Sequence, residues 1–137
     1  MNVLIVGLGS IANKHVEALR SLNFDFKIYA LRSNLNSEKH KNIINLYDLN
    51  DIDFVFDFAI ISNPTQFHEK FIRILIKMGI NIFIEKPPLN SLLRVEELLS
   101  ELKASKIKTY VACNLRFHPC ILFIKKYIDE NKNKIIN

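Results

Sequence analysis

The sequence predicts a doubly wound α/β domain, in which a mostly parallel sheet carries helices on both faces. Short apolar runs rich in β-branched residues alternate with segments of helical periodicity along the whole chain. A glycine-containing turn separates the first apolar run from the first helical segment. Of the 137 residues, 49% are hydrophobic, which is enough to fill one continuous core.

The first half of the chain is expected to supply three strands and one helix. Residues 3–6 form an apolar run that Gly7 ends, which is typical of a strand buried on both faces. Residues 11–22 follow, with apolar side chains on one face of a helix. Residues 26–31 and 43–47 are the next two predicted strands, and the polar stretch between them is expected to be a loop with at most a short helix.

The middle of the chain carries the clearest strand pattern. Residues 54–61 are apolar at most positions, and the Ser-Asn-Pro sequence at 62–64 ends the run. Pro64 suits the first turn of a helix because its missing N–H is harmless there. This helix is expected to run to about residue 78, since Gly79 stands where a C-terminal glycine is typical.

The remaining residues continue the alternation. Residues 80–84 are the fifth predicted strand, and Ser91 is expected to cap a helix that runs to residue 105. Residues 108–112 form the sixth strand, and an amphipathic helix is predicted at 119–130. Because strands and helices alternate throughout, right-handed crossovers between parallel strands are expected.

The turn Gly7-Leu-Gly9-Ser-Ile-Ala12 matches G-x-G-x-x-[GA] between a predicted strand and a predicted helix, as the Rossmann fingerprint requires. Gly7 allows the tight turn, Gly9 lets a pyrophosphate approach the backbone, and Ala12 lets the helix pack closely on the strand. Ser10 and Ile11 open the helix, whose free N–H groups and positive dipole end favour phosphates. The turn therefore predicts dinucleotide binding. A turn that binds nothing and a site for S-adenosylmethionine are the alternatives.

The end of the second predicted strand bears on the choice between NAD and NADP. Arg32-Ser33 stands where an acidic residue would bind the ribose of NAD. Arg32 can instead pair with a 2′-phosphate, and Ser33 can donate to it. A hydrogen bond to a charged group contributes about 1.5–3 kcal/mol, or roughly 10- to 150-fold in affinity. The sequence therefore favours NADP over NAD and disfavours a methyltransferase, with a solvated surface arginine as the alternative.

Composition argues against several other classes of protein. The net charge of +5 comes from scattered lysines, which are typical of solvated helix faces rather than a nucleic-acid surface. No apolar run is long enough to cross a membrane, and the start lacks the features of a signal peptide. Cys113 and Cys120 do not form a Cys-x-x-Cys pair, so no metal site is predicted. We expect reduced thiols in a cytoplasmic protein, with Cys113 in the core.

Four segments together resemble the Gfo/Idh/MocA oxidoreductase family, and they cover nearly the whole chain in order. They are the glycine turn at 7–12, Ile-Ser-Asn-Pro-Thr-Gln-Phe-His at 61–68, Ile-Glu-Lys-Pro at 84–87, and Tyr-Val-Ala-Cys-Asn-Leu-Arg-Phe-His-Pro at 110–119. The Glu-Lys-Pro tripeptide at the end of a strand is the most specific of them. Each segment follows a predicted strand, at the edge where doubly wound sheets bind ligands.

The resemblance implies a role for individual residues. Lys86 is implied as the catalytic lysine beside the nicotinamide and the substrate carbinol, where it would stabilise developing negative charge. Glu85 would orient Lys86 or contact the ribose. The remaining residues implied to contact the cofactor are Ser62, Asn63, Pro64, His68, Asn114 and Arg116. Plainer readings stay open, because Lys86 could be a solvated turn lysine, His68 a hydrogen-bonding residue at a helix start, and Arg116 the partner of a carboxylate.

The resemblance also implies how the chain is divided. Residues 1–120 would form the NAD(P)-binding domain, and residues 121–137 a connecting helix and the start of a second domain, with its first strand at 134–137. The chain is then expected to be part of an oxidoreductase that moves hydride to or from a hydroxyl carbon of a sugar, cyclitol or related substrate. By itself it would bind the cofactor weakly and turn nothing over, and an uncovered apolar face would allow self-association. A non-catalytic dinucleotide-binding or sensor module is the alternative.

Overall fold

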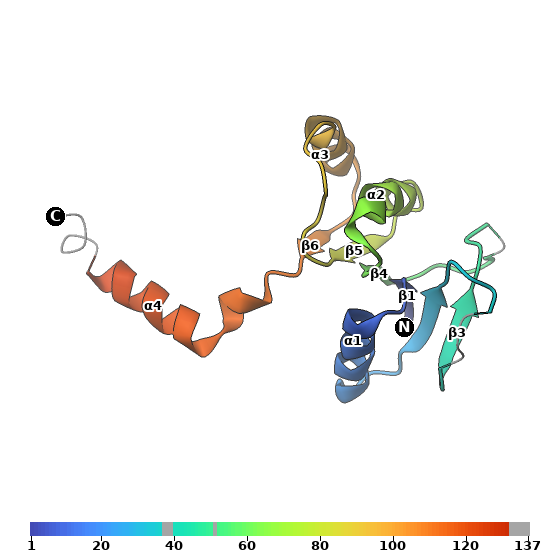
Figure 1. The fold of residues 1–137 in the computed structure, drawn as a ribbon, viewed down its shortest axis with the longest axis horizontal. Helices are drawn as coiled ribbons and strands as arrows, with labels where there is room; N and C mark the ends of the chain where they lie inside the picture. Colours follow the sequence, from blue (N-terminus) through green and yellow to red (C-terminus); the bar gives the residue numbers. More distant parts are fainter. Residues whose placement is uncertain (37–39, 51, 132–137) are drawn as a thin grey trace.

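The computed structural model describes residues 1–36, 40–50 and 52–131, and these residues form a six-stranded, all-parallel sheet. Its strand order is β3-β2-β1-β4-β5-β6 (Figure 1). The strands are β1 (Asn2–Val6), β2 (Lys27–Leu31), β3 (Ile43–Leu46), β4 (Phe58–Ile61), β5 (Asn81–Ile84) and β6 (Thr109–Val111). The chain builds outward from β1 to β3 and then returns to place β4 on the other side of β1. The predicted doubly wound fold is confirmed, and its switch point lies between β1 and β4.

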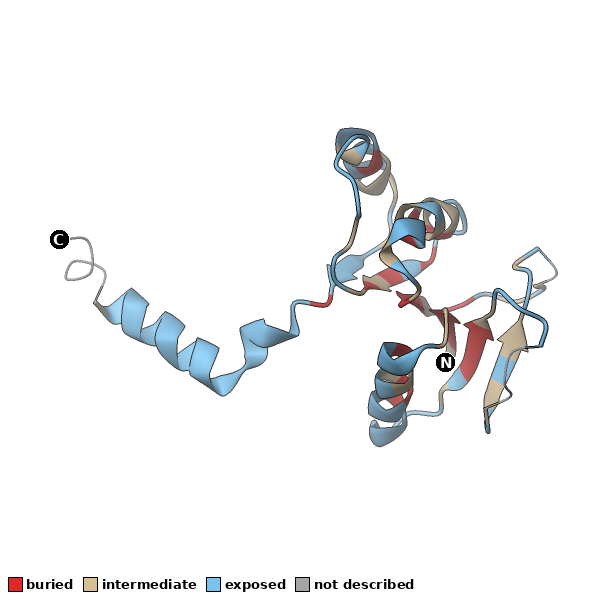
Figure 2. Ribbon diagram, viewed as in Figure 1, coloured by how far each residue is buried: buried red, intermediate tan, exposed pale blue. Residues whose placement is uncertain are grey.

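Helices cover both faces of the sheet, because side chains alternate along each buried strand. The helices are α1 (Ser10–Ser21), α2 (His68–Lys77), α3 (Val95–Ala104) and α4 (Pro119–Glu130), with short 3-10 turns η1 (Thr65–Phe67) and η2 (Asn114–Phe117). Figure 1 shows α1 on one side of the sheet and α2 and α3 on the other. The central strands and the inner sides of these helices hold most of the buried residues (Figure 2).

Two apolar clusters stabilise this arrangement. Under α1, Val3 and Ile5 of β1 meet Ala12, Val16 and Leu19 of the helix. On the opposite face, Leu4 and Val6 of β1 meet α2 and α3 in a cluster that also includes Ile61, Ile72, Leu75 and Leu98. Full burial of one such aliphatic side chain contributes about 1.5–3 kcal/mol, so both helical layers are held firmly on the sheet.

Most predicted elements are confirmed to within about two residues, but three starts were wrong. β4 begins at Phe58 and not at residue 54. Phe54 and Phe56 instead pack against Tyr29, with ring centroids 4.8 and 5.4 Å away, so their apolar character reflects core packing rather than strand pairing. The residues after Pro64 form η1 before α2 begins.

The third helix also starts later than predicted. Ser91 does not cap it, because its hydroxyl accepts a hydrogen bond from the N–H of Leu93 at 3.3 Å within a turn. α3 then begins at Val95, without a capping side chain. By contrast, Gly79 ends α2 as predicted, with φ of +68°.

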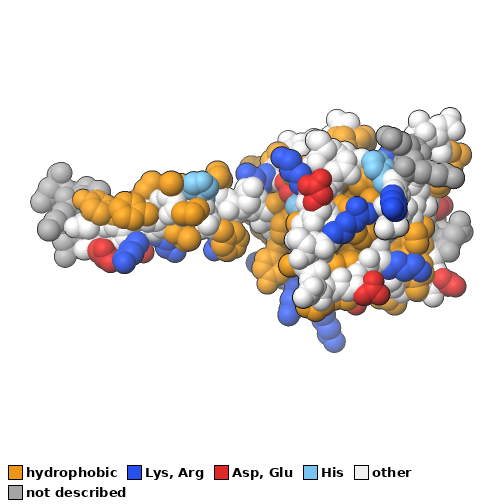
Figure 3. All heavy atoms as spheres, turned by 90° about the horizontal axis from the view of Figure 1, so that it is seen from below, with side chains coloured by type: hydrophobic (Ala, Val, Ile, Leu, Met, Phe, Trp, Pro, Cys, Tyr) orange, Lys and Arg blue, Asp and Glu red, His pale blue; other side chains and the backbone are white. Residues whose placement is uncertain are grey.

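The last described helix, α4, has the predicted bounds and extends away from the sheet (Figure 1). It is exposed along its length (Figure 2), and hydrophobic side chains gather on its surface (Figure 3). Cys113, which precedes η2, is exposed, so its prediction as a core thiol was wrong. The predicted strand at 134–137 lies outside the described residues. Within those residues, no helix is long and apolar enough to cross a membrane.

Candidate functional site

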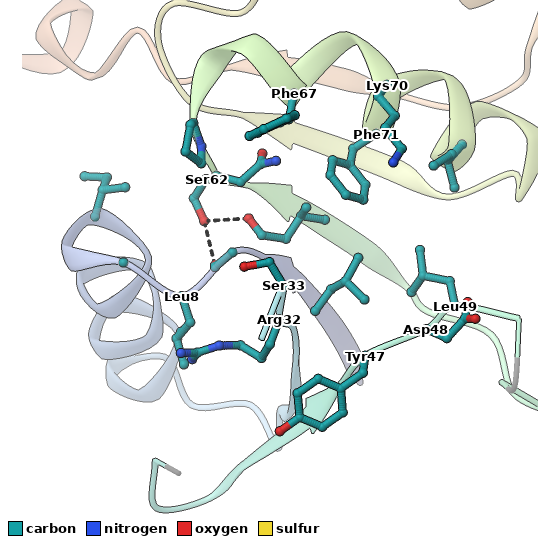
Figure 4. A pocket seen from close by; sticks show the side chains of 18 of the residues that line it. Leu8, Arg32, Ser33, Tyr47, Asp48, Leu49, Ser62, Phe67, Lys70 and Phe71 are labelled. Carbon is teal, nitrogen blue, oxygen red and sulfur yellow. Dashed lines mark hydrogen bonds between the residues drawn. The ribbon is translucent and has the colours of Figure 1, made fainter. Parts of the chain in front are cut away.

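A cleft of about 1000 Å³ opens at the carboxyl ends of the central strands. Its walls are the turn after β1, the residues that follow β2, β3 and β4, and one side of α2 (Figure 4). This is the crevice where doubly wound sheets bind ligands, and its volume suits a molecule of cofactor size. Of the predicted contact residues, those that line it are Gly7, Gly9, Ser10, Ile11, Arg32, Ser33, Ser62, Asn63 and Pro64.

Gly7 stands where two chain segments approach each other closely. Its φ is +82°, and its N–H donates to the carbonyl of Leu31 at 3.0 Å. A Cβ at this position would lie 2.8 Å from the Cβ of Asn63 and 2.9 Å from its Cα. Gly7 therefore serves the tight turn that the sequence predicts, and it also lets the turn after β4 pack against the turn after β1.

Gly9 has a different role, because nothing lies within 4 Å of the position that its Cβ would take. It is the N-cap of α1, has ordinary extended backbone angles and makes no side-chain cap, and the first helical turn contains no acidic residue. The first N–H groups of a helix have no intrahelical acceptors, and the positive end of its dipole favours an anion. Ala12 is fully buried beneath this turn, as its predicted packing role requires.

The segment after β4 is fixed to the glycine turn by hydrogen bonds. The Ser62 hydroxyl lies 3.3 Å from the carbonyl of Val6 and 3.2 Å from that of Gly7 (Figure 4). His68 is 1% exposed, and its Nε2 lies 2.8 Å from the carbonyl of Asn63. His68 is the first residue of α2, and its hydrogen bond stabilises the Asn63-Pro64 turn. His68 itself does not line the cleft.

Arg32 and Ser33 follow β2 and line the cleft, and their contact with a 2′-phosphate stays a prediction. The Arg32 side chain runs beside Leu8 (Figure 4), and its Nη1 is buried without a hydrogen-bond partner. The Oδ1 of Asn63, in the facing wall, is buried and unpaired in the same way. Buried polar groups are nearly always satisfied, so these two atoms fit a cleft whose ligand completes their hydrogen bonds.

Several lining residues were not predicted as site residues. Asp48 and its neighbours follow β3, and the N–H of Asn50 donates to the Asp48 carboxylate at 3.0 Å, which lowers the pKa of Asp48. Four further lining residues follow the i, i+3, i+4, i+7 spacing of one helical face on η1 and α2, and they are Phe67, Lys70, Phe71 and Ile74. That helical spacing was readable from the sequence, but the cleft that it faces was not.

The residues implied near the nicotinamide do not line this cleft. Lys86 is exposed in the turn after β5, and the Lys86–Pro87 peptide bond is cis. Glu85 pairs with His15 of α1, with 2.7 Å between Oε1 and Nε2. Asn114 and Arg116 lie exposed on η2, where the Arg116 guanidinium is 5.7 Å from the ring centre of Phe117. Their contacts with a nicotinamide stay a prediction.

A cluster of charged residues lies between α2 and α3, away from the cleft. Arg73 of α2 contacts Glu69 on its own helix and Glu101 on α3. Arg94 donates two hydrogen bonds to Glu97, at 3.0 and 2.9 Å, and this contact lowers the pKa of Glu97. The cluster joins the two helices that cover one face of the sheet. Among the described residues, no group of three metal-binding side chains is found.

Comparisons with known proteins agree with this geometry. The family model for Gfo/Idh/MocA, described as an oxidoreductase family with an NAD-binding Rossmann fold, matches residues 1–113. Inositol 2-dehydrogenase of Rhizobium meliloti (strain 1021) is 28% identical over 135 residues, which cover 93% of this chain and 40% of that protein.

Solved structures show the same fold at lower identity. A myo-inositol 2-dehydrogenase from Lactobacillus plantarum superposes with a TM-score of 0.82 at 20% identity, covering 96% of this chain and 42% of the other. The WlbA (WbpB) dehydrogenase from Thermus thermophilus, solved in complex with NAD and alpha-ketoglutarate, has a TM-score of 0.78 at 20% identity and covers 95% and 47%. The chain spans less than half the length of each of these proteins.

Proposed function

This chain belongs to the Gfo/Idh/MocA oxidoreductase family with an NAD-binding Rossmann fold, and from this premise we propose that its cleft holds NADP(H) for hydride transfer at a hydroxyl carbon. The proposal rests on the N-terminus of α1 at Gly9, which has no capping side chain and faces the cleft beside the switch point of the sheet. An uncapped helix start at this position suits a pyrophosphate.

The residues of the cleft fit the dinucleotide. The N–H groups after Gly9, at Ser10 and Ile11, would bind the pyrophosphate, and no side chain of Gly9 blocks its approach. Asn63 and Pro64 would line the path toward the nicotinamide, where the unpaired Oδ1 of Asn63 would accept a hydrogen bond from the cofactor. The chemistry that the dinucleotide supplies when bound is the donation or acceptance of hydride at the nicotinamide ring.

The preference for NADP over NAD rests on the end of β2. Arg32 reaches the cleft with a buried, unpaired Nη1, and Ser33 next to it is exposed. A guanidinium binds phosphate strongly because its N–H groups match the oxygens in geometry and charge. The acidic residue that NAD-binding folds use for the ribose 2′-hydroxyl is absent from this position.

Lys86 is proposed as the catalytic residue. It follows β5 at the same edge of the sheet, and its exposed ammonium group is free to hydrogen-bond the oxygen of the reacting carbon. That contact would stabilise the negative charge that develops on the oxygen. A sugar or cyclitol is the proposed substrate class, which the inositol dehydrogenases among the compared proteins support.

Coenzyme choice is tested by titrating the chain with NADPH and NADH and following nicotinamide fluorescence. Arg32→Ala should weaken NADPH binding by roughly 10- to 150-fold and leave NADH binding unchanged, because only NADPH carries the 2′-phosphate. Arg20→Ala removes the same charge from an exposed residue outside the cleft lining and serves as the control. Equal weakening of both coenzymes, or of neither, would contradict the role of Arg32.

The catalytic role of Lys86 is tested in the full-length protein. Sugars and cyclitols are the substrates, and NADPH formation is the signal. Lys86→Ala should abolish turnover and retain coenzyme binding, whereas Lys77→Ala, in the last turn of α2, should change neither. Full activity of Lys86→Ala would refute the role. Coenzyme binding without turnover of any tested substrate by the unmutated protein would favour the sensor alternative.

A further inference from the structure

A chain of hydrogen bonds connects helix α1 to the turn that carries Lys86. The Nε2 of His15 lies 2.7 Å from Oε1 of Glu85. The other carboxylate oxygen of Glu85 accepts the backbone N–H of Lys86 at 3.3 Å. One carboxylate therefore contacts both the helix that begins at the glycine turn and the backbone of the lysine.

The fold places these residues together through the alternation of side chains on β5. Phe83 and Glu85 are two residues apart and point to the face of the sheet that α1 covers. The ring of His15 packs edge-on against Phe83, with centroids 5.5 Å apart and an interplanar angle of 76°. The same ring thus lies on Phe83 and reaches Glu85.

The hydrogen bond between His15 and Glu85 lies in a partly buried place. A carboxylate only accepts hydrogen bonds, so Nε2 of His15 is the donor. The two side chains are 20% and 16% exposed, which shields the contact from most of the solvent. The backbone of Glu85 is held as well, because its N–H donates to the carbonyl of Ile61 on β4 at 3.0 Å. Glu85 is therefore fixed from two sides.

We propose that His15 is a positioning residue, which acts through Glu85 to hold the Lys86 turn at a set distance from the phosphate-binding start of α1. The proposal rests on the proposed function, in which α1 binds the pyrophosphate and Lys86 lies beside the nicotinamide. β5 ends at Ile84, and its hydrogen bonding to β4 continues to the N–H of Glu85, one residue before Lys86. The hydrogen bond from His15 fixes the position of the chain there. Both halves of one dinucleotide can then contact their binding residues at the same time.

Two substitutions separate the hydrogen bond from the packing of the ring. His15→Phe keeps an aromatic ring against Phe83 and removes the donor. His15→Gln keeps an N–H donor at a similar reach and removes the ring. A role in positioning requires the Phe variant to be defective and the Gln variant to be close to the unmutated chain, whereas a role in packing alone reverses this order.

The first measurement needs no ligand. Amide hydrogen exchange at Lys86, followed by NMR, should be about 3- to 10-fold faster in His15→Phe than in the unmutated chain and nearly normal in His15→Gln. In a Glu85→Ala background, His15→Phe should add nothing, because both changes break the same link. Unchanged exchange in His15→Phe would overturn the proposal, whatever the chain binds.

The second measurement compares whole coenzymes with their adenylate halves, NADPH with 2′,5′-ADP and NADH with AMP. His15→Phe should weaken the whole coenzyme by about 3- to 10-fold and leave the half unchanged, and His15→Gln should restore the affinity. Equal weakening of whole and half would show a general structural defect and overturn the positioning role. Failure of the unmutated chain to bind any of the four ligands would refute the proposed function instead.

Discussion

Replacing Gly7 by alanine is expected to destabilise the fold strongly, in contrast to the same change at Gly9. At Gly7 the new methyl group would lie 2.8 Å from the Cβ of Asn63, in a backbone with φ of +82°. A left-handed conformation costs an alanine about 1–2 kcal/mol, and forcing a methyl group into a packed site costs about 1–3 kcal/mol. The expected loss is therefore about 2–5 kcal/mol.

The matched change at Gly9 should leave stability almost intact. Nothing lies within 4 Å of its Cβ position, and its φ of −94° suits any residue. Gly9→Ala should change the free energy of unfolding by less than about 1 kcal/mol. In the proposed function the methyl group would stand where the pyrophosphate approaches, so we expect NADPH binding to weaken by about tenfold or more, the cost of roughly one poorly fitting methyl group.

Urea unfolding and coenzyme titration of both variants test this reasoning. With a urea dependence of about 1–3 kcal/mol per molar, the unfolding midpoint of Gly7→Ala should fall by about 1 M or more. The midpoint of Gly9→Ala should stay near that of the unmutated chain. Equal destabilisation by both changes would refute the distinct roles assigned to the two glycines. Unimpaired NADPH binding by Gly9→Ala would refute the placement of the phosphate.

Further predictions concern stability. Leu75 is fully buried between α2 and the sheet, so Leu75→Ala should cost about 2–5 kcal/mol in urea unfolding, whereas Leu93→Ala, at 94% exposed, should change stability by less than about 0.5 kcal/mol. Arg94 lowers the pKa of Glu97 in the folded chain. A carboxyl group whose pKa is lower in the folded than in the unfolded chain stabilises the fold at pH values above its ordinary pKa. This stabilisation is lost as the pH falls through the lowered value. The urea midpoint of Glu97→Gln should therefore fall less steeply in acid. An equally steep fall in that variant would contradict the contribution of Glu97.

The fold and part of the site followed from local patterns. Strand and helix periods, the backbone of the glycine turn and Gly79 depend on residues close in sequence, and these predictions of local structure are confirmed. The start of β4 did not follow, because Phe54 and Phe56 are apolar for packing on Tyr29 and not for pairing with a strand. An apolar alternation indicates burial, but it does not identify the partner that buries it.

That the first strand ends in a glycine turn of the phosphate-binding type could be predicted from the residues alone, because the motif is contained in a few consecutive residues. Three features instead depend on residues that are distant in the chain: the close approach of Asn63 to Gly7, the face of α2 that lines the cleft, and the contact between His15 and Glu85. His15 and Glu85 are 70 positions apart in the chain. Their meeting depends on the strand order and on the face that α1 covers, which are set by packing of the whole domain and not by any local run of residues.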